Sequence, residues 1–92
     1  MTNNVIEIDV VKPAAQLGYA KIEGFVNGSD FEVIVYQENL QIDYITLDDE
    51  TVWANNVMHL EEPIVNPIDA TLLEDFRMMV ATQIRTTRAR RR

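Results

Sequence analysis

The strongest chemical signal in this sequence is a group of arginines at its C-terminus. Five of the last eight residues are arginine, namely Arg85, Arg88, Arg90, Arg91 and Arg92. Each guanidinium is a planar fork of N–H donors that suits bidentate contact with a carboxylate or a phosphate. All 15 acidic residues lie in residues 1–84 beside only three basic ones, a formal charge of −12, whereas residues 85–92 add +5. The pattern predicts a basic C-terminal arm that binds an anion outside the acidic body.

Two classes of anion fit such an arm. Nucleic acid is one, because arginine-rich segments gain affinity by neutralising phosphates and releasing counterions. The acidic body opposes this binding, since like charges repel over a Debye length of roughly 8 Å at physiological ionic strength. An acidic protein surface is the favoured partner, and a neighbouring copy of this chain supplies one. We therefore expect a non-enzymatic interaction or assembly subunit, in a homo-oligomer or larger complex of the kind that small viral proteins form, with nucleic-acid binding as the alternative.

A third hypothesis uses the acidic body and ignores the arm. A small β-rich protein with carboxylates on one surface can occupy the cationic groove of a nucleic-acid-binding enzyme, as a mimic of the nucleic acid. The acidic residues that strand alternation or turn position places outside are Glu7, Asp9, Glu23, Glu32, Asp43, Asp48, Asp49 and Glu50. The carboxylates of the sheet face and turns are also the expected receptor surface for an arginine arm.

The sequence offers no group of residues suited to catalysis or to holding a cofactor. With one serine, one histidine and no cysteine, the only nucleophile and base would be Ser29 and His59, which belong to different segments. The three glycines do not form a phosphate-binding loop. We therefore expect no enzyme activity and no cofactor.

Metal sites and a nucleic-acid stacking platform are not predicted either. Asp48-Asp49-Glu50 and His59-Glu61-Glu62 hold oxygen and imidazole donors, but neighbouring residues of a strand point to opposite faces and so do not converge on one ion. Trp53 and the three tyrosines could stack on single-stranded nucleic acid, yet aromatic residues on half-buried strands usually serve packing. We expect solvated turns and packing contacts at these positions.

Alternating apolar residues predict a series of short antiparallel strands. The expected strands are 5–11, 19–26, 31–37, 41–47 and 51–54, with 57–60 as a short edge strand. Asn27-Gly28 predicts a tight hairpin between the second and third strands, because both residues tolerate positive φ. A two-residue loop would place Glu23 opposite Glu32, so the favoured register has a four-residue loop that places Val26 opposite Phe31.

One helix is predicted after the strands. Asn66 can cap it, Pro67 suits its first position, and an apolar stripe runs as far as Ile84. The arc that carries this stripe contains Ile68, Leu72, Leu73, Phe76, Met79, Val80, Gln83 and Ile84, of which Gln83 is polar. Met78 lies on the opposite, polar side of the helix, where it is either an isolated exposed side chain or a contact for a partner.

These elements define the expected architecture. We predict an α+β fold in which a twisted antiparallel sheet of four or five strands is packed on one face by a helix at about 67–84. Residues 1–84 form a single acidic domain, and residues 85–92 form the arm that leaves the helix. The sequence contains no secretory signal and no apolar stretch of membrane-spanning length, which favours a soluble, intracellular protein or part of an assembled particle, without a membrane partner.

Overall fold

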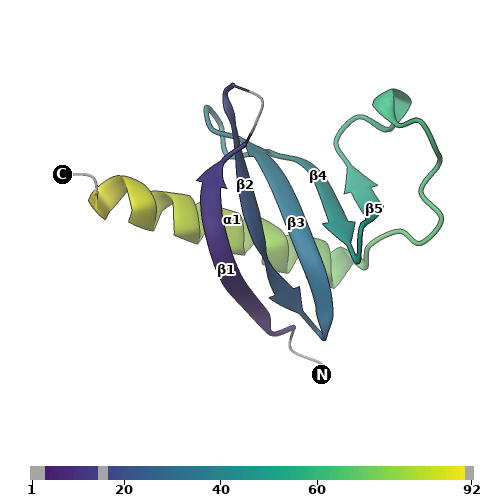
Figure 1. Ribbon diagram of the computed structural model, residues 1–92, viewed down its shortest axis with the longest axis horizontal. Coiled ribbons are helices and arrows are strands. Elements are labelled where there is room, and N and C mark those ends of the chain that lie inside the picture. The colour runs from purple at the N-terminus through teal and green to yellow at the C-terminus, as the bar shows by residue number, and fades with distance from the viewer. Residues whose placement is uncertain (1–3, 15–16, 91–92) are drawn as a thin grey trace.

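The computed structural model contains one five-stranded antiparallel sheet and one long helix, which confirms the predicted α+β fold (Figure 1). The structure describes residues 4–14 and 17–90, with side chains of the helix described as far as Thr82. The elements are β1 (Ile6–Pro13), β2 (Tyr19–Val26), β3 (Ser29–Tyr36), β4 (Ile42–Leu47), β5 (Glu50–Ala54), the 3-10 helix η1 (Val57–His59) and α1 (Ala70–Arg90). Each strand pairs with the next one in the chain, so the sheet is a simple meander.

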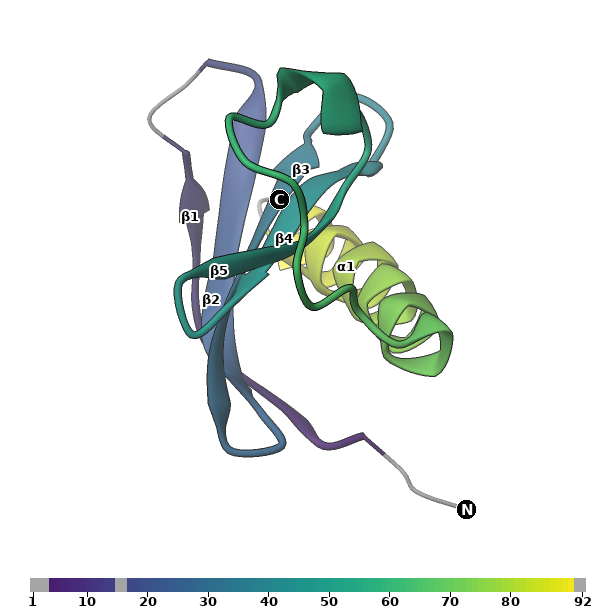
Figure 2. The same cartoon turned by 90° about the vertical axis from the view of Figure 1, so that its right-hand side faces the viewer.

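The helix covers one face of the sheet and leaves the other face open (Figure 2). The core lies between them and contains Leu72, Phe76 and Val80 of α1, as the apolar stripe predicts. The ring of Phe76 packs edge-on against Phe31, with 5.0 Å between the ring centroids. Among the side chains that the structure describes, Ile22, Val33, Val35, Ile45 and Phe76 have no exposed surface. Burial of each such side chain stabilises the fold by roughly 1.5–3 kcal/mol.

The β2–β3 hairpin has a two-residue loop, so the predicted four-residue loop is wrong. Val26 pairs with Ser29, which leaves only Asn27 and Gly28 in the loop. These two residues have φ of 52° and 84°. A two-residue turn with positive φ at both positions matches the right-handed twist of the flanking strands. A four-residue loop would lose the pairing between Val26 and Ser29.

The two-residue loop places Glu23 directly opposite Glu32, the like-charge pair that favoured the other register in the prediction. The repulsion is offset by Lys21, whose Nζ lies 3.8 Å from Glu23 and 3.7 Å from Glu32. Because Lys21 compensates both carboxylates, charge repulsion does not favour a four-residue loop over the two-residue loop.

β1 forms one edge of the sheet, and most of its residues are exposed. It ends at Pro13, two residues beyond the predicted end, and pairs with β2 through an irregularity near its centre. Gly24 of β2 permits the close approach of the two strands, because a Cβ at this position would lie 1.9 Å from the carbonyl oxygen of Glu7. The position of β1 therefore depends on a glycine in its neighbour.

β4 and β5 are joined by a second two-residue turn, Asp48-Asp49, in which both residues have positive φ. Beyond β5, the predicted edge strand at 57–60 is wrong, because residues Val57–His59 form η1 instead. The side chain of Asn56 accepts a hydrogen bond from the N–H of Met58 at 3.1 Å. This cap stabilises a helical turn where apolar alternation had suggested an extended segment.

α1 begins at Ala70, later than the predicted start at Pro67. The cap is Asp69, whose Oδ2 accepts hydrogen bonds from the first backbone N–H groups of the helix at 3.0 and 3.3 Å. The preceding segment runs beside β5, where the N–H of Ile68 donates to the carbonyl oxygen of Val52 at 2.9 Å. This contact holds Asn66 and Pro67 outside the helix.

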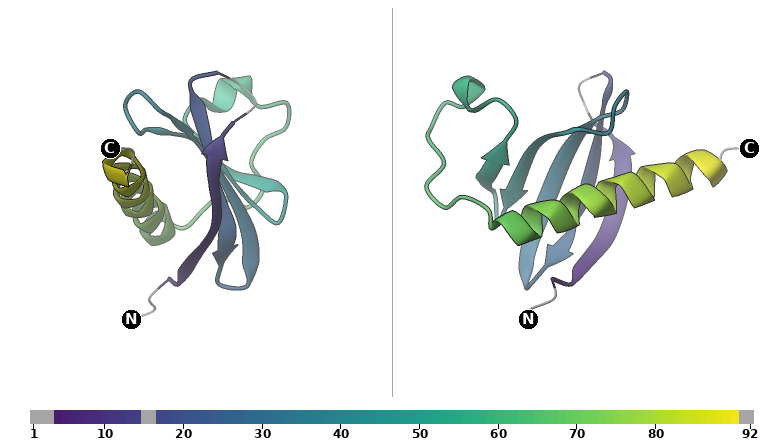
Figure 3. Two further views of the ribbon diagram at one scale, coloured as in Figure 1. Left: turned by 60° about the vertical axis from the view of Figure 1, so that its left-hand side comes forward. Right: turned by 180° about the vertical axis from the view of Figure 1, so that it is seen from behind.

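α1 also continues beyond the predicted end at Ile84, as far as Arg90. No glycine or proline follows Ile84, and cations in the last turns complement the helix dipole. The C-terminal turns of α1 cross β1 and extend past this edge of the sheet (Figures 1 and 3). The residues of the predicted arm are therefore partly a continuation of the helix.

Candidate interaction surfaces

The helical part of the arginine segment is held away from the acidic face of the sheet. Arg85, Arg88 and Arg90 belong to α1, while Arg91 and Arg92 lie outside the described residues. At 1.5 Å per residue, the 21 residues of α1 span about 30 Å. Its first turns pack on the sheet and its last turns pass the β1 edge (Figure 3). The helix therefore places the backbone of these three arginines beyond the β1 edge, at one end of the molecule.

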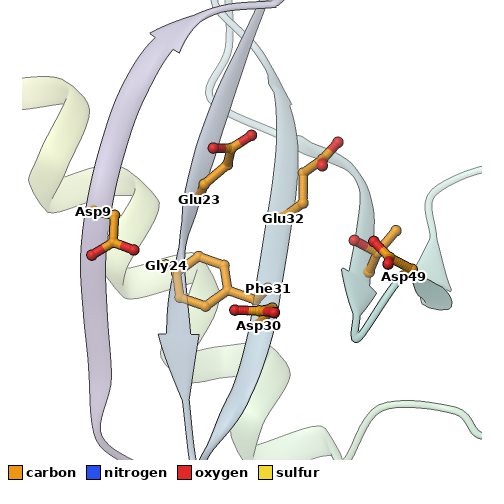
Figure 4. A pocket seen from close by; sticks show the side chains of 8 residues that line it. Asp9, Glu23, Gly24, Asp30, Phe31, Glu32 and Asp49 are labelled. Atoms are coloured by element: carbon orange, nitrogen blue, oxygen red, sulfur yellow. The ribbon is translucent and has the colours of Figure 1, made fainter.

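The open face of the sheet carries a hollow with an acidic lining (Figure 4). The volume of this hollow is about 250 Å³, and α1 lies behind the strands that form it. Its acidic residues are Asp9 of β1, Glu23 of β2, Asp30 and Glu32 of β3, and Asp49 of the β4–β5 turn. Four of these five belong to the predicted acidic surface, and we call the five residues the acidic hollow.

The sequence reasoning missed Asp30 as a member of the acidic hollow. The four-residue loop would have placed this residue in the turn, whereas the observed register makes it a strand residue opposite Phe25. The N–H of Asp30 donates to Oδ1 of Asp48 at 3.0 Å, and the N–H of Asp48 donates to the carbonyl oxygen of Asp30 at 2.8 Å. These two hydrogen bonds join the ends of both tight hairpins beside the hollow.

The other predicted acidic residues lie outside the lining of the hollow. Asp43 accepts a hydrogen bond from the hydroxyl of Tyr36 at 3.0 Å, and Glu50 borders a different hollow beside η1. Glu7 is an exposed residue of β1. The predicted acidic surface is therefore divided among several parts of the sheet.

Two lysines partly compensate the charge of the acidic hollow. Lys21 lies within 3.8 Å of both Glu23 and Glu32, and Lys12 of β1 lies 3.8 Å from Glu23. Among the side chains that the structure describes, no lysine or arginine forms such an ion pair with Asp9 or Asp49. An incoming arginine would have to compete with Lys21 for the two central carboxylates, which weakens this hollow as a receptor.

Met78 is exposed on α1, as helical periodicity predicts, with 68% of its surface accessible. It lies between Arg77 and the half-buried Met79, on the side of the helix that faces away from the sheet. Arg77 forms an ion pair with Glu74 one turn earlier on the helix. The outward side of α1 thus carries both charges and one large apolar side chain.

The single serine and histidine lie in different parts of the fold. Ser29 begins β3 at the tip of the β2–β3 hairpin, whereas His59 ends η1 near the opposite end of the strands (Figure 1). The Nε2 atom of His59 is 3.3 Å from the side-chain nitrogen of Asn56. The described structure does not bring Ser29 and His59 together as a nucleophile and base.

The two candidate metal-binding runs meet at one hollow of about 420 Å³ beside η1. Asp49 and Glu50 line one side of it, and His59, Glu61 and Glu62 line the other. Within residues 4–14 and 17–90, however, no group of three acidic or histidine side chains is close enough to hold a metal ion. The two runs therefore line the same hollow without forming a metal-coordination site.

The aromatic residues do not form a single stacking platform. The rings of Tyr19 and Tyr36 pack against each other on the open face of the sheet, with centroids 4.8 Å apart. Trp53 instead lies beside α1, where Cζ of Arg77 is 5.8 Å from the centre of its ring. Trp53 and this tyrosine pair are thus separated by the sheet and serve local packing.

Among the helices that the structure describes, none combines the length and apolar character needed to cross a membrane. No protein-family model matches the chain, and no curated protein or solved structure matches it either. A functional assignment therefore depends on the surfaces described above.

Proposed function

We propose that this chain is a non-enzymatic interaction subunit whose arginine-bearing helix end docks on an acidic protein surface, with a neighbouring copy as the favoured partner. The observation that carries the proposal is the course of α1, which continues through Arg85 and Arg88 to Arg90 and extends past the β1 edge (Figure 3). The acidic hollow lies on the other side of the sheet (Figure 4). The backbone of α1, as far as Arg90, is therefore directed away from that carboxylate cluster of its own subunit.

The charge distribution favours a protein over a nucleic acid as the partner. Residues 1–84 carry a formal −12, so a duplex that approaches the helix end also approaches an acidic body. An acidic protein patch is smaller than a nucleic acid and can meet the helix end without extending over the rest of the surface. Nucleic-acid binding through the same arginines is the alternative, and the following experiment distinguishes it from binding to an acidic protein.

Several arginines are needed because one exposed ion pair contributes little. A solvent-exposed pair of an arginine and a carboxylate is worth up to about 1 kcal/mol, and screening by salt reduces it further. Five guanidinium groups in the last eight residues can engage an acidic surface together, with affinity that falls as salt is added. We expect a reversible, salt-sensitive interaction.

The test compares the full chain with two variants in which all five arginines are replaced, one with glutamine and one with lysine. Each protein is passed over immobilised poly-glutamate and over immobilised duplex DNA at low and moderate salt. The proposal predicts that the chain binds poly-glutamate, that the lysine variant binds more weakly because it lacks the planar fork, and that the glutamine variant does not bind.

Two results would contradict the proposal. Binding to DNA without binding to poly-glutamate would favour the nucleic-acid alternative. Equal retention of the parent chain and the glutamine variant on poly-glutamate would show that the arginines are not the contact residues. Circular dichroism of all three proteins checks that the fold is unchanged.

A further inference from the structure

The outward side of α1 carries a regular row of residues. Starting at Thr71, steps of three and four residues alternate along the helix, and the row consists of Thr71, Glu74, Met78, Ala81, Arg85 and Arg88. At 100° per residue, the five positions from Glu74 to Arg88 fall within an arc of about 80°, opposite the position of Phe76. This spacing is the one by which two helices pack along a shared seam. We call these six residues the outer row.

The outer row changes character along the helix. Its first half contains Glu74, its middle contains Met78 and the small Ala81, and its second half contains Arg85 and Arg88. Of the members whose side chains the structure describes, Thr71, Glu74 and Met78 are exposed and Ala81 is half-buried. A helix that is acidic at one end, apolar in the middle and basic at the other is complementary to itself when two copies run antiparallel.

We infer that α1 of one subunit packs antiparallel against α1 of a second copy through the outer row. The inference rests on the proposed function and names both the partner and the acidic surface that receives the arginines. One register satisfies the whole row: Met78 faces the partner's Ala81, and Glu74 faces the partner's Arg85. The two-fold axis then passes between Met78 and Ala81, and each contact occurs twice.

Packing considerations agree with this register. Met78 is a flexible apolar side chain that fills the space above a small residue, and Ala81 allows the two helix backbones to approach closely. The sheets of the two copies would lie on the outside of the helix pair, because each α1 packs its other side on its own sheet (Figure 2). The arrangement therefore requires no change in either subunit.

The pairing also gives a reason for the length of α1. The turns that extend past the β1 edge lie beyond the last strand of the described sheet (Figure 3). In an antiparallel pair, these turns lie along the first half of the partner's helix, where Glu74 and Asp75 are located. The carboxylate of Glu74 would exchange its exposed partner within the helix, Arg77, for the partner's Arg85.

The decisive experiment uses two full-length charge-reversal variants, Glu74→Arg and Arg85→Glu, in sedimentation velocity over a range of concentrations. The parent chain should form dimers in a salt-sensitive way. Each variant alone places like charges opposite each other twice, so its self-association should weaken by roughly tenfold or more. Mixing the two variants restores both opposite-charge pairs, so the mixture should form the dimer that neither variant forms alone.

A second pair of variants tests the apolar centre of the row. Met78→Glu should abolish the dimer, whereas Met58→Glu should leave it intact, because Met58 is 86% exposed on η1 and lies outside the row. Thermal melting of each variant checks that the subunit remains folded. A dimer that resists Met78→Glu would overturn the inference.

The outcomes separate this inference from the proposed function. A parent chain that stays monomeric at every concentration, or a mixture of charge variants that fails to dimerise, overturns the antiparallel pair. If poly-glutamate binding is still lost in the glutamine variant, the proposed function survives with a different partner. If the dimer does not form and the glutamine variant binds poly-glutamate as well as the parent chain does, both proposals fail.

Discussion

Glu23 and Glu32 face each other across β2 and β3, and one lysine lies within 3.8 Å of both. A direct like-charge pair normally destabilises an antiparallel ladder. Here Lys21, with only 27% of its side chain exposed, compensates both carboxylates at once. The register of the hairpin therefore depends on a diagonal neighbour as well as on the residues that face each other.

Replacing Lys21 should leave the repulsion between Glu23 and Glu32 uncompensated. Lys21→Gln is expected to lower the free energy of unfolding by about 1 kcal/mol at low salt and by less at high salt, because salt screens the charges. The measurement is urea denaturation at two salt concentrations, since urea itself adds no ions. Lys12→Gln is the matched control, because Lys12 is 50% exposed and contacts only Glu23. An equal loss in both variants would contradict this explanation.

Gly24 is expected to be indispensable for the position of β1. Gly24→Ala would place a Cβ 1.9 Å from the carbonyl oxygen of Glu7, so the backbone of β1 has to move. We expect destabilisation of about 3 kcal/mol or more, together with faster amide hydrogen exchange in β1. Gly28→Asn is the control, because that site has open space and asparagine tolerates its φ of 84°. Retained protection of β1 in Gly24→Ala would refute the prediction.

Most of the fold could be predicted from local patterns. Period-two alternation located the five strands of the meander, and the apolar stripe of the helix identified Leu72, Phe76 and Val80 as the residues that cover the sheet. Both signals are strong because they reflect which side of an element faces the core. The exposed position of Met78 follows from the same periodicity.

Several errors came from contacts that the local apolar pattern does not contain. The hairpin register was wrong because pairwise charge reasoning did not include Lys21. The late start of α1 depends on the hydrogen bond from Ile68 to Val52, which no local cap signal contains. The acidic hollow likewise combines residues of β1 and the β4–β5 turn, whose proximity only the folded sheet determines.

The hydroxyl of Tyr36 should influence stability at alkaline pH. Hydrogen bonds with Tyr19 and Asp43 favour its neutral form and raise the pKa of Tyr36 to about 12, from an ordinary value near 10. The folded state holds this proton after the unfolded chain has lost it. The stabilising contribution is therefore complete below pH 10 and is lost as the pH rises from 10 to about 12.

Two variants test this pH dependence. Tyr36→Phe should flatten the decline of unfolding free energy between pH 10 and 12, as measured by urea denaturation. Asp43→Asn removes the charge of the carboxylate that accepts the hydrogen bond from the Tyr36 hydroxyl, so the pKa of Tyr36 should move back toward 10 in a titration of tyrosinate absorbance. An unchanged titration curve in Asp43→Asn would show that Asp43 does not contribute.

The two sides of α1 should respond differently to truncation of a large apolar side chain. Phe76 has no exposed surface and packs on Phe31, so Phe76→Ala leaves a cavity and should cost about 3–5 kcal/mol. Met78 is 68% exposed, so Met78→Ala should change the free energy of unfolding of the monomer by less than about 0.5 kcal/mol.

Measurement of unfolding at low and high protein concentration tests whether Met78 contributes to the proposed contact between two copies of α1. A dimer is stabilised by mass action, so the apparent stability of the parent chain should rise with protein concentration. Met78→Ala should remove most of that rise while leaving the low-concentration value unchanged, because Met78 contributes to the contact between subunits and not to the core. A concentration dependence that persists in Met78→Ala would place the contact between copies elsewhere on the molecule.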